Sequence, residues 1–191
     1  MGHDSHDHSD SSGLKHAHAR SASEAHVPGQ HKAHAPTQVS TVVVTCSDSR
    51  ELAADESGAL IQAALERDGH LVVRRKVIRD EPIAIGAALE DASALGARAV
   101  IFNGGTGIGA RDSTVETLRA LFDKELPGFG EIFRALSFAE IGSAAMMSRA
   151  TAGTVRGMVV FSVPGSPAAA RLAMERLILP ELGHAVRELT R

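Results

Sequence analysis

The residues of this chain that are best suited to chemistry are a glycine-rich stretch and two aspartates. The stretch reads GGTGIGARD over residues 104–112 and follows the apolar run at 99–102. Glycine lets successive backbone N–H groups converge on one point, and such a concavity binds anions. Asp80 and Asp112 supply carboxylates of the kind that Mg²⁺ accepts alongside phosphate oxygens and water. The combination predicts a site for a phosphate-bearing ligand and a divalent cation.

Two standard nucleotide motifs do not account for the glycines. A P-loop requires G-x-x-x-x-G-K-[ST], whereas Gly104 and Gly109 are followed by Ala110 and Arg111. A dinucleotide fingerprint follows the first strand of its unit, whereas these glycines follow the third predicted strand. As a bare motif, the stretch is also open to interpretation as a tight structural turn.

The two aspartates have structural interpretations as well. Asp80 could cap the helix that begins after Pro82, and Asp112 could cap the helix that begins near Ser113. A carboxylate at the end of a buried strand is nevertheless costly unless it faces solvent, a cation or a hydrogen-bond donor. The sequence alone therefore leaves two roles open for each aspartate, as a helix cap or as a ligand of Mg²⁺.

The elements that must position these groups alternate between buried strands and helices. Apolar β-branched runs predict the strands, and apolar residues at helical spacing predict the helices. We expect strands at 41–46, 70–78, 98–102 and 157–163, and helices at 57–68, 82–96, from 113 onward, at 127–153 (broken) and after 167 (interrupted at Pro180). This alternation predicts an α/β fold: a three-layer α/β/α domain with a mainly parallel, doubly wound, Rossmann-like sheet.

The predicted topology brings distant polar segments to one edge of the sheet. In such a sheet, ligands bind in the crevice at the carboxyl ends of the strands. The segments that follow the four predicted strands are Ser47–Asp48, Asp80, the glycine stretch and the PGSP run at 164–167. We therefore expect these four segments to form one site.

The first 40 residues differ from the rest of the chain. They hold eight of the ten histidines and almost no apolar residue larger than alanine, so they cannot bury enough surface to offset the entropy of ordering. We expect residues 1–40 to be a disordered His-rich tail and residues 41–191 to be a single domain. The tail histidines could chelate Ni or Zn weakly, or they could be low-complexity or purification sequence.

Composition excludes several classes of function. The net charge of −3 does not suggest a nucleic-acid partner. No apolar run is long enough to predict a signal peptide or a membrane span. The single cysteine, Cys46, rules out an intrachain disulfide and fits a reducing compartment, so we expect the protein to be cytoplasmic.

From about residue 41 to residue 187, the chain resembles the MoaB/Mog family of molybdenum cofactor biosynthesis proteins, the molybdopterin adenylyltransferases. The glycine stretch carries the resemblance together with six others in the order of the family. These are SDSR at 47–50, DESG at 55–58, RDEP at 79–82, PGFGEIFR at 127–134, EIGSAAMMSRATAG at 140–153 and PGSP at 164–167. They cover nearly the whole predicted domain.

The resemblance implies an activity and a set of site residues. Active members transfer AMP from Mg–ATP to the phosphate of molybdopterin and release pyrophosphate. Asp80 and Asp112 match the catalytic aspartates and would handle Mg²⁺ and ATP. The backbone of Gly104, Gly105, Thr106 and Gly107 would hold phosphate; Ser47, Asp48, Ser148 and Arg149 would contact the pterin or its phosphate; and Gly165 and Ser166 would line the nucleotide side.

The match to the family has departures, and other functions remain open. Val115 stands where the family usually has proline, and some members of the MoaB branch lack the acid that Asp80 represents here. An inactive molybdopterin-binding carrier would keep the site without turnover. The related domain of competence-damage proteins points instead to nucleotide pyrophosphatase chemistry, and an NAD-dependent oxidoreductase is a weak third alternative.

The resemblance also implies an assembly. We expect a homotrimer or a hexamer of paired trimers, with a molybdenum-insertion protein as a further partner. Four of the six phenylalanines fall between residues 122 and 138, more large apolar side chains than a peripheral segment should expose. Those phenylalanines could equally complete the core of the monomer.

Overall fold

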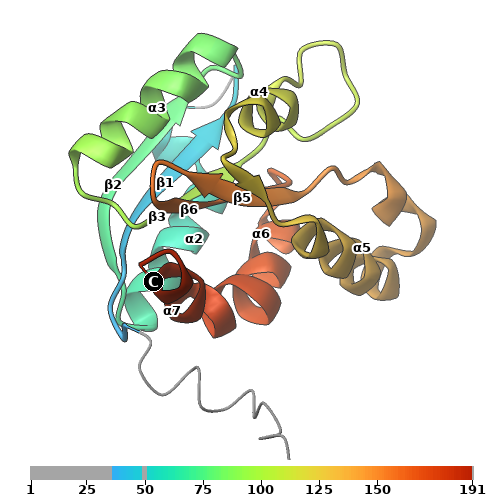
Figure 1. Cartoon of the computed structure of the whole chain (residues 1–191). Coiled ribbons are helices and arrows are strands. Elements are labelled where there is room, and N and C mark those ends of the chain that lie inside the picture. The colour runs from blue at the N-terminus through green and yellow to red at the C-terminus, as the bar shows by residue number, and fades with distance from the viewer. Residues whose placement is uncertain (1–35, 49–50, 191) are drawn as a thin grey trace, which may run out of the picture.

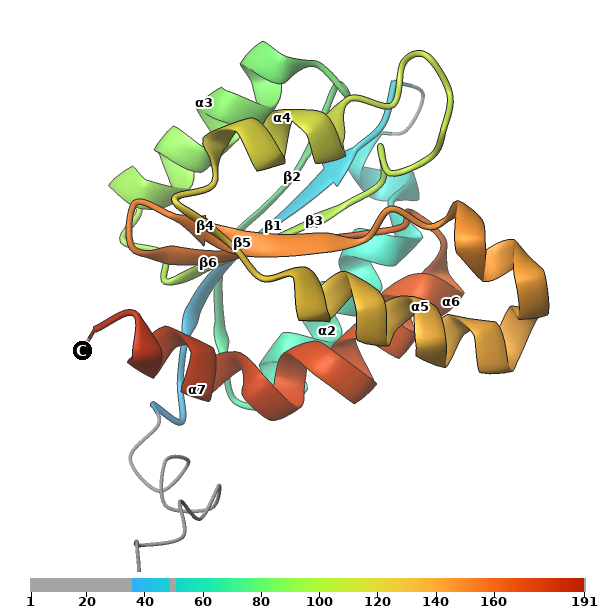
Figure 2. The ribbon, with the colours of Figure 1, turned by 45° about the vertical axis from the view of Figure 1, so that its right-hand side comes forward.

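The domain is a single six-stranded sheet with helices on both faces. The structure is a computed structural model that describes residues 36–48 and 51–190. The strands lie in the order β2-β1-β3-β6-β5-β4, and the sheet forms the middle layer between two layers of helices (Figures 1 and 2). The predicted three-layer α/β fold is confirmed.

Four adjacent strands of the sheet pair in parallel, and the last two join it through antiparallel pairings. β1 pairs in parallel with β2 and β3, and β3 pairs in parallel with β6. β5 and β4 extend the sheet in antiparallel pairings at the other edge. The strands are β1 (Ser40–Cys46), β2 (Leu71–Ile78), β3 (Ala99–Asn103), β4 (Lys124–Glu125), β5 (Thr151–Val155) and β6 (Met158–Val163).

The helices divide between the two faces. α3 (Pro82–Ala94) and α4 (Thr114–Leu121) cover one face, and α2 (Glu56–Arg67), α5 (Pro127–Ile141), α6 (Pro167–Ala173) and α7 (Leu179–Glu188) cover the other (Figure 2). Short 3₁₀ turns lie at η1 (Leu52–Ala54) and η2 (Gly142–Met147). A π-helical segment, η3 (Met174–Ile178), joins α6 to α7, where Pro180 cannot continue the regular hydrogen-bond pattern.

Side chains of successive strand residues alternate between two cores. Val43 packs with α2, α5, α6 and α7, whereas Val42 and Val44 pack with α3 and α4. A strand that is buried on both faces needs no alternation of apolar and polar residues. This explains why the apolar run that begins at residue 41 shows no alternation.

The order of the strands places a crevice between β1 and β3. The chain passes from β1 to β2 on one side and then returns to β3 on the other side of β1. In doubly wound sheets such a switch point is where ligands bind. Ser47 follows β1 at this edge, and the glycine loop (residues 104–113) follows β3.

Two sequence predictions about the fold need correction. Residues 127–153 are not all broken helix, because Thr151–Val155 forms β5, which pairs with β6 through a two-residue turn at Arg156 and Gly157. The domain also begins before residue 41. Val39 is buried, its N–H donates to Nδ1 of His70, and β1 starts at Ser40. Residues 1–35 of the predicted tail lie outside the described residues.

None of the helices formed by residues 36–48 and 51–190 is long and apolar enough to cross a membrane.

Candidate functional site

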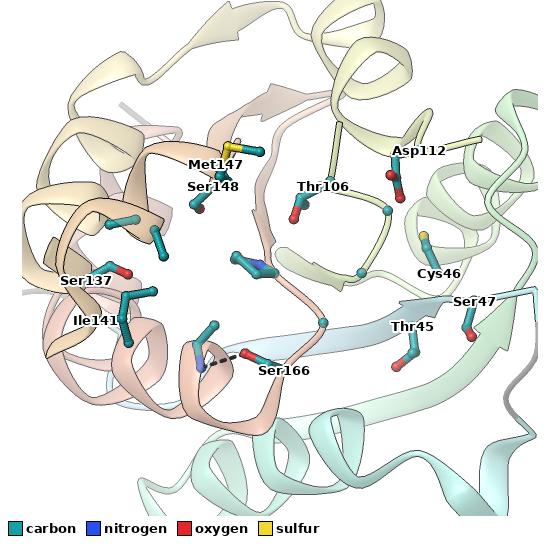
Figure 3. Close-up of a pocket in the computed structure, with 18 residues that line it drawn as sticks. Thr45, Cys46, Ser47, Thr106, Asp112, Ser137, Ile141, Met147, Ser148 and Ser166 are labelled. Atoms are coloured by element: carbon teal, nitrogen blue, oxygen red, sulfur yellow. Dashed lines mark hydrogen bonds between the residues drawn. The ribbon is translucent and has the colours of Figure 1, made fainter. Parts of the chain in front are cut away.

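A cavity of about 570 Å³ opens at the carboxyl edge of the sheet, beside the crevice between β1 and β3. Figure 3 shows its labelled side chains pointing inward from β1, the glycine loop, α5, η2 and the turn before α6. Of the residues predicted to bind substrate, eight line this cavity: Ser47, Gly104, Gly105, Thr106, Gly107, Ser148, Gly165 and Ser166. Asp112, predicted to be catalytic, lines it as well. Three of the four segments predicted to form one site thus meet at this cavity, whereas Asp80 does not line it.

The glycine loop lies so close to its neighbours that side chains cannot be added at its start. Gly104 has φ +93° and a Cβ there would overlap the carbonyl of Cys46. Gly105 has φ +62° and a Cβ there would overlap the carboxylate of Asp80 and the hydroxyl of Thr114. Both positions therefore require glycine for backbone conformation and for space.

Asp112 forms two hydrogen bonds with Gly109 of the same loop. Its Oδ2 accepts from the N–H of Gly109 at 2.8 Å, and its own N–H donates to the carbonyl of Gly109 at 3.0 Å. This closes a tight turn and does not cap α4. The other carboxylate oxygen has no partner among the described residues, and the side chain lines the cavity.

Asp80 lies on the other side of the same loop. Its Oδ1 accepts from the hydroxyls of Ser113 and Thr114 at 3.1 and 2.8 Å, and its Oδ2 accepts from the N–H of Ser113 at 3.2 Å. Asp80 thus binds the start of α4, where the helix dipole favours negative charge. It does not cap α3, whose N-cap residue is Glu81.

A second cleft, also of about 570 Å³, lies on the Asp80 side of the loop. Its lining carries three acids and two arginines: Asp48, Asp80, Glu81, Arg79 and Arg111. Asp48, predicted to contact the pterin, lies here and accepts from the N–H of Asp80 at 3.4 Å. The glycine loop and the Ser47–Asp48 pair therefore form a wall that the two clefts share.

Arg149 differs from its prediction as a ligand contact. It is not among the residues that line either cleft. Its Nε donates to the carbonyl of Thr106 at 3.1 Å, its Nη2 donates to the carbonyl of Asp112 at 3.2 Å, and its Nη1 pairs with Glu116. Arg149 therefore supports the loop from a distant part of the sequence.

The turn before α6 closes the cavity opposite the glycine loop. Ser166 is the N-cap of α6 and accepts from the N–H of Ala169 at 3.3 Å. A Cβ on Gly165 would lie 3.1 Å from the Cα of Gly104, so the two loops approach each other closely. Ser57, on α2, donates to the carbonyl of Gly165 at 2.9 Å and fixes this turn.

Cys46 lines the cavity at the end of β1 but is a poor nucleophile. Burial raises the pKa of its thiol to about 12, the Asp80 carboxylate acts in the same direction, and a hydrogen bond with Thr114 acts against them. A thiol in this state carries almost no thiolate at neutral pH. We assign Cys46 a packing role.

Two groups of residues at the site were not predicted from the sequence. One is an apolar wall formed by Ile141, Ala144, Ala145 and Met147 of α5 and η2. The other is a buried polar chain beneath the cavity. Asn103 donates to Thr45 at 2.8 Å, Thr45 donates to Asp55 at 2.8 Å, and Asp55 caps α2 and pairs with Arg75 at 3.4 Å.

The predicted magnesium ion would need ligands besides the carboxylates of Asp80 and Asp112. Within residues 36–48 and 51–190, no group of three or more His, Cys, Asp or Glu side chains is placed to hold a metal. Mg²⁺ usually takes only one or two carboxylates and completes its octahedron with water and phosphate oxygens. The free oxygen of Asp112 and the remaining lone pair of Asp80 could serve in this way.

Comparison with known proteins agrees with this geometry. The family model described as "Probable molybdopterin binding domain" matches residues 39–184. The chain belongs to this family. The match begins at the buried Val39 and spans all six strands of the sheet, both clefts and the loop between them.

Individual members of the molybdopterin-binding-domain family are similar over most of their length. Molybdenum cofactor biosynthesis protein B of Bacillus subtilis (strain 168) is 50% identical over 156 residues, which cover 81% of this chain and 92% of that protein. The same-named protein of Halalkalibacterium halodurans is 49% identical over 156 residues, again 81% of this chain and 92% of that protein. The crystal structure of the tungsten cofactor synthesizing protein MoaB from Pyrococcus furiosus has a TM-score of 0.74 and 41% identity, covering 82% of this chain and all of that one.

Proposed function

We propose that this chain acts in molybdenum cofactor biosynthesis as a molybdopterin adenylyltransferase. It would transfer AMP from Mg–ATP to the terminal phosphate of molybdopterin and release pyrophosphate. The observation that carries the proposal is the shared wall between the clefts, with Asp112 on the cavity side and Asp80 on the other. The two reactants would then bind in neighbouring clefts and meet at the border between them, where the backbone of the loop would hold phosphate.

The cavity suits the pterin substrate and its phosphate. Its apolar wall can pack against a fused ring, and the hydroxyls of Ser47, Ser148 and Ser166 can bind ring polar groups. Small-molecule sites commonly combine an apolar surface with polar groups that fix the orientation of the ligand. The backbone of Gly105 and Gly107 is available for the phosphate.

The second cleft suits the triphosphate of ATP. Arg79 and Arg111 can bind phosphate oxygens, and planar guanidinium groups do this with two donors at once. Among the described residues Arg111 has no other partner. The carboxylates of Asp48, Asp80 and Glu81 would repel an anion unless a divalent cation lies between them, which agrees with a Mg–nucleotide complex.

The chemistry requires alignment more than proton transfer. A phosphate monoester is largely doubly ionised at neutral pH, with a second pKa of about 6, so its oxygen can attack without a general base. A bond forms from that oxygen to the α-phosphorus of ATP, and the bond from the α-phosphorus to the bridging oxygen of the β-phosphate breaks. The released pyrophosphate keeps the electron pair. Catalysis then depends on positioning the reactants and on neutralising the negative charge of the phosphates. Bound Mg²⁺ would supply part of the positive charge that this requires.

Pyrophosphate release from ATP in the presence of molybdopterin and Mg²⁺ tests the proposal. We expect release only when all three are present, together with adenylylated molybdopterin as the product. Molybdopterin binding without pyrophosphate release would indicate a carrier. Hydrolysis of ADP-ribose without molybdopterin would indicate a nucleotide pyrophosphatase.

A further inference from the structure

Arg149 holds both ends of the glycine loop although it lies far away in the sequence. It follows η2 and precedes β5, and its guanidinium reaches the carbonyls of Thr106 and Asp112, which are 43 and 37 residues away. The loop's other hydrogen bonds between Gly109 and Asp112 tie it only to itself. Arg149 therefore connects Thr106 and Asp112, near the two ends of the loop, to the segment between η2 and β5.

The contact with Asp112 continues to Asp80 through a single peptide group. The carbonyl of Asp112 accepts from Nη2 of Arg149, and the N–H of the same peptide, on Ser113, donates to Oδ2 of Asp80 at 3.2 Å. A positive and a negative side chain thus hold opposite ends of one planar unit. Hydrogen bonds arranged in series polarise one another, so each contact strengthens the other.

The contact with Thr106 also fixes the orientation of the peptide between Thr106 and Gly107. In a trans peptide the carbonyl and the N–H point in opposite directions. When the carbonyl of Thr106 is held toward Arg149, the N–H of Gly107 points away from that guanidinium. Thr106 and Gly107 both line the cavity, and a rotation of this peptide would remove a donor from the phosphate cradle.

We propose that Arg149 is a positioning residue that fixes the glycine loop in its ligand-binding form and holds the peptide that orients Asp80. It does so without contacting the ligand. The three acceptors Thr106, Asp112 and Glu116 match the planar fork of arginine, which lysine cannot reproduce. The kinetic part of this inference rests on the proposed adenylyl transfer, but the structural part does not.

The direct test is amide hydrogen exchange in the full chain without ligand. Arg149→Lys keeps the charge but removes the fork, so we expect the amides of Gly109, Asp112 and Ser113 to exchange at least roughly tenfold faster, while strand amides are unchanged. The matched control is Arg119→Lys. Arg119 lies on α4 and pairs with Glu125 at 2.9 Å, so its replacement should leave loop exchange unchanged.

A second variant keeps the test decisive if Arg149→Lys fails to fold. Glu116→Gln leaves both carbonyl contacts in place but removes the ion pair that orients the guanidinium. We expect a smaller acceleration of exchange at the same three amides. Unchanged exchange in every variant that folds would overturn the proposal, whatever the activity.

The kinetic constants kcat and KM distinguish a positioning role of Arg149 from a role in binding substrate. If the loop is misplaced, kcat for pyrophosphate release in Arg149→Lys should fall by about 10²-fold, because small displacements of aligned reactants cost this much. The KM values should change little. Faster exchange with unchanged kcat would overturn the positioning role. If the wild type releases no pyrophosphate at all, the proposed function fails, and the exchange result still decides the structural inference.

Discussion

The hydroxyl of Thr114 donates to Oδ1 of Asp80 at 2.8 Å and so joins the first residue of α4 to the end of β2. Asp80 and Thr114 are 34 residues apart, and Gly105 packs against both. The position of the Asp80 carboxylate is therefore fixed by three segments at once. This relationship makes the site sensitive to small changes at residues that never contact a ligand.

Gly105→Ala should damage both stability and activity. A methyl group at this position would overlap Asp80 and Thr114, and φ is +62°. We expect a loss of about 1–3 kcal/mol in the free energy of unfolding, with loss of pyrophosphate release. Urea unfolding measures the first effect. Gly86→Ala is the matched control, because a methyl there meets nothing within 4 Å in helix α3, and it should stabilise by about 0.5–1 kcal/mol.

Acid should destabilise the domain through His70. Nδ1 of His70 accepts from the N–H of Val39, so the ring must be neutral at that atom. Burial lowers the pKa of His70 below its ordinary value of 6.5, although Asp68 acts against this. The unfolded chain then binds the proton more readily, so the contribution of His70 is present above pH 6.5 and is lost as the pH falls through the lower folded pKa.

The His70 effect can be isolated by urea unfolding between pH 5 and pH 7.5, with the range chosen around the ordinary pKa of about 6.5. In His70→Asn the dependence of the free energy of unfolding on pH should become flatter than in the wild type. His184→Gln is the control, because His184 lies on the surface of α7 and contacts Glu181 and Glu188. An equally steep dependence in His70→Asn would contradict the assignment.

Removal of N-terminal residues should leave the stability of the domain unchanged only if the truncated chain keeps the buried Val39. A chain that starts at Pro36 should have the thermal midpoint of the full chain, because Val39 remains in the core. A chain that starts at Thr41 should be less stable by about 2 kcal/mol, since it loses one buried valine and a backbone contact to His70. Equal midpoints for the two truncated chains would show that Val39 contributes nothing.

The exposed apolar side chains of α5 and η2 predict self-association. Phe138 and Met146 are 62% and 77% exposed, and Ile132 and Ile141 are more than half exposed. A patch of this kind usually marks an interface, and the predicted trimer or pair of trimers would cover it. Sedimentation equilibrium of the wild type and of Phe138→Ser measures this. A wild type that stays monomeric at micromolar concentration would refute the prediction.

The position of the site could be predicted from sequence because it depends on topology. Alternating strands and helices fix which ends of the strands meet, so Ser47, Asp80, Gly104 and Gly165 had to lie on one edge. β5 could not be predicted in the same way. Its residues TAGTV are small and lack a strong apolar pattern, and it forms because β6 and β4 supply hydrogen-bond partners on both sides.

The role of each residue in the site depends on which atoms its side chain contacts. The spacing of residues in the sequence does not reveal these contacts. The motif around Arg149 predicted a ligand contact, yet the guanidinium of Arg149 donates hydrogen bonds to two carbonyls of the loop. Asp80 and Asp112 looked equivalent in sequence, yet they lie on opposite sides of that loop. No local pattern reports on which side of a loop a carboxylate lies.

Asp80→Asn tests the role of the Asp80 charge. The substitution keeps size and polarity but removes the negative charge, and it places an amide near the N–H of Ser113. We expect a stability cost of about 1–3 kcal/mol, which the domain should tolerate. Molybdopterin binding should survive, because its predicted contacts lie on the cavity side of the loop. Thr114→Val is the control, because it removes one hydrogen bond to Asp80 and leaves the charge.

The rate of pyrophosphate release with molybdopterin, ATP and Mg²⁺, compared among the wild type, Asp80→Asn and Thr114→Val, is the most direct measurement. If Asp80 aligns the Mg–nucleotide, the wild type releases pyrophosphate and Asp80→Asn is slower by on the order of 10²–10³, whereas Thr114→Val loses much less. Release by Asp80→Asn at the wild-type rate would show that Asp80 only fastens α4 to β2, and the proposed catalytic site would be wrong.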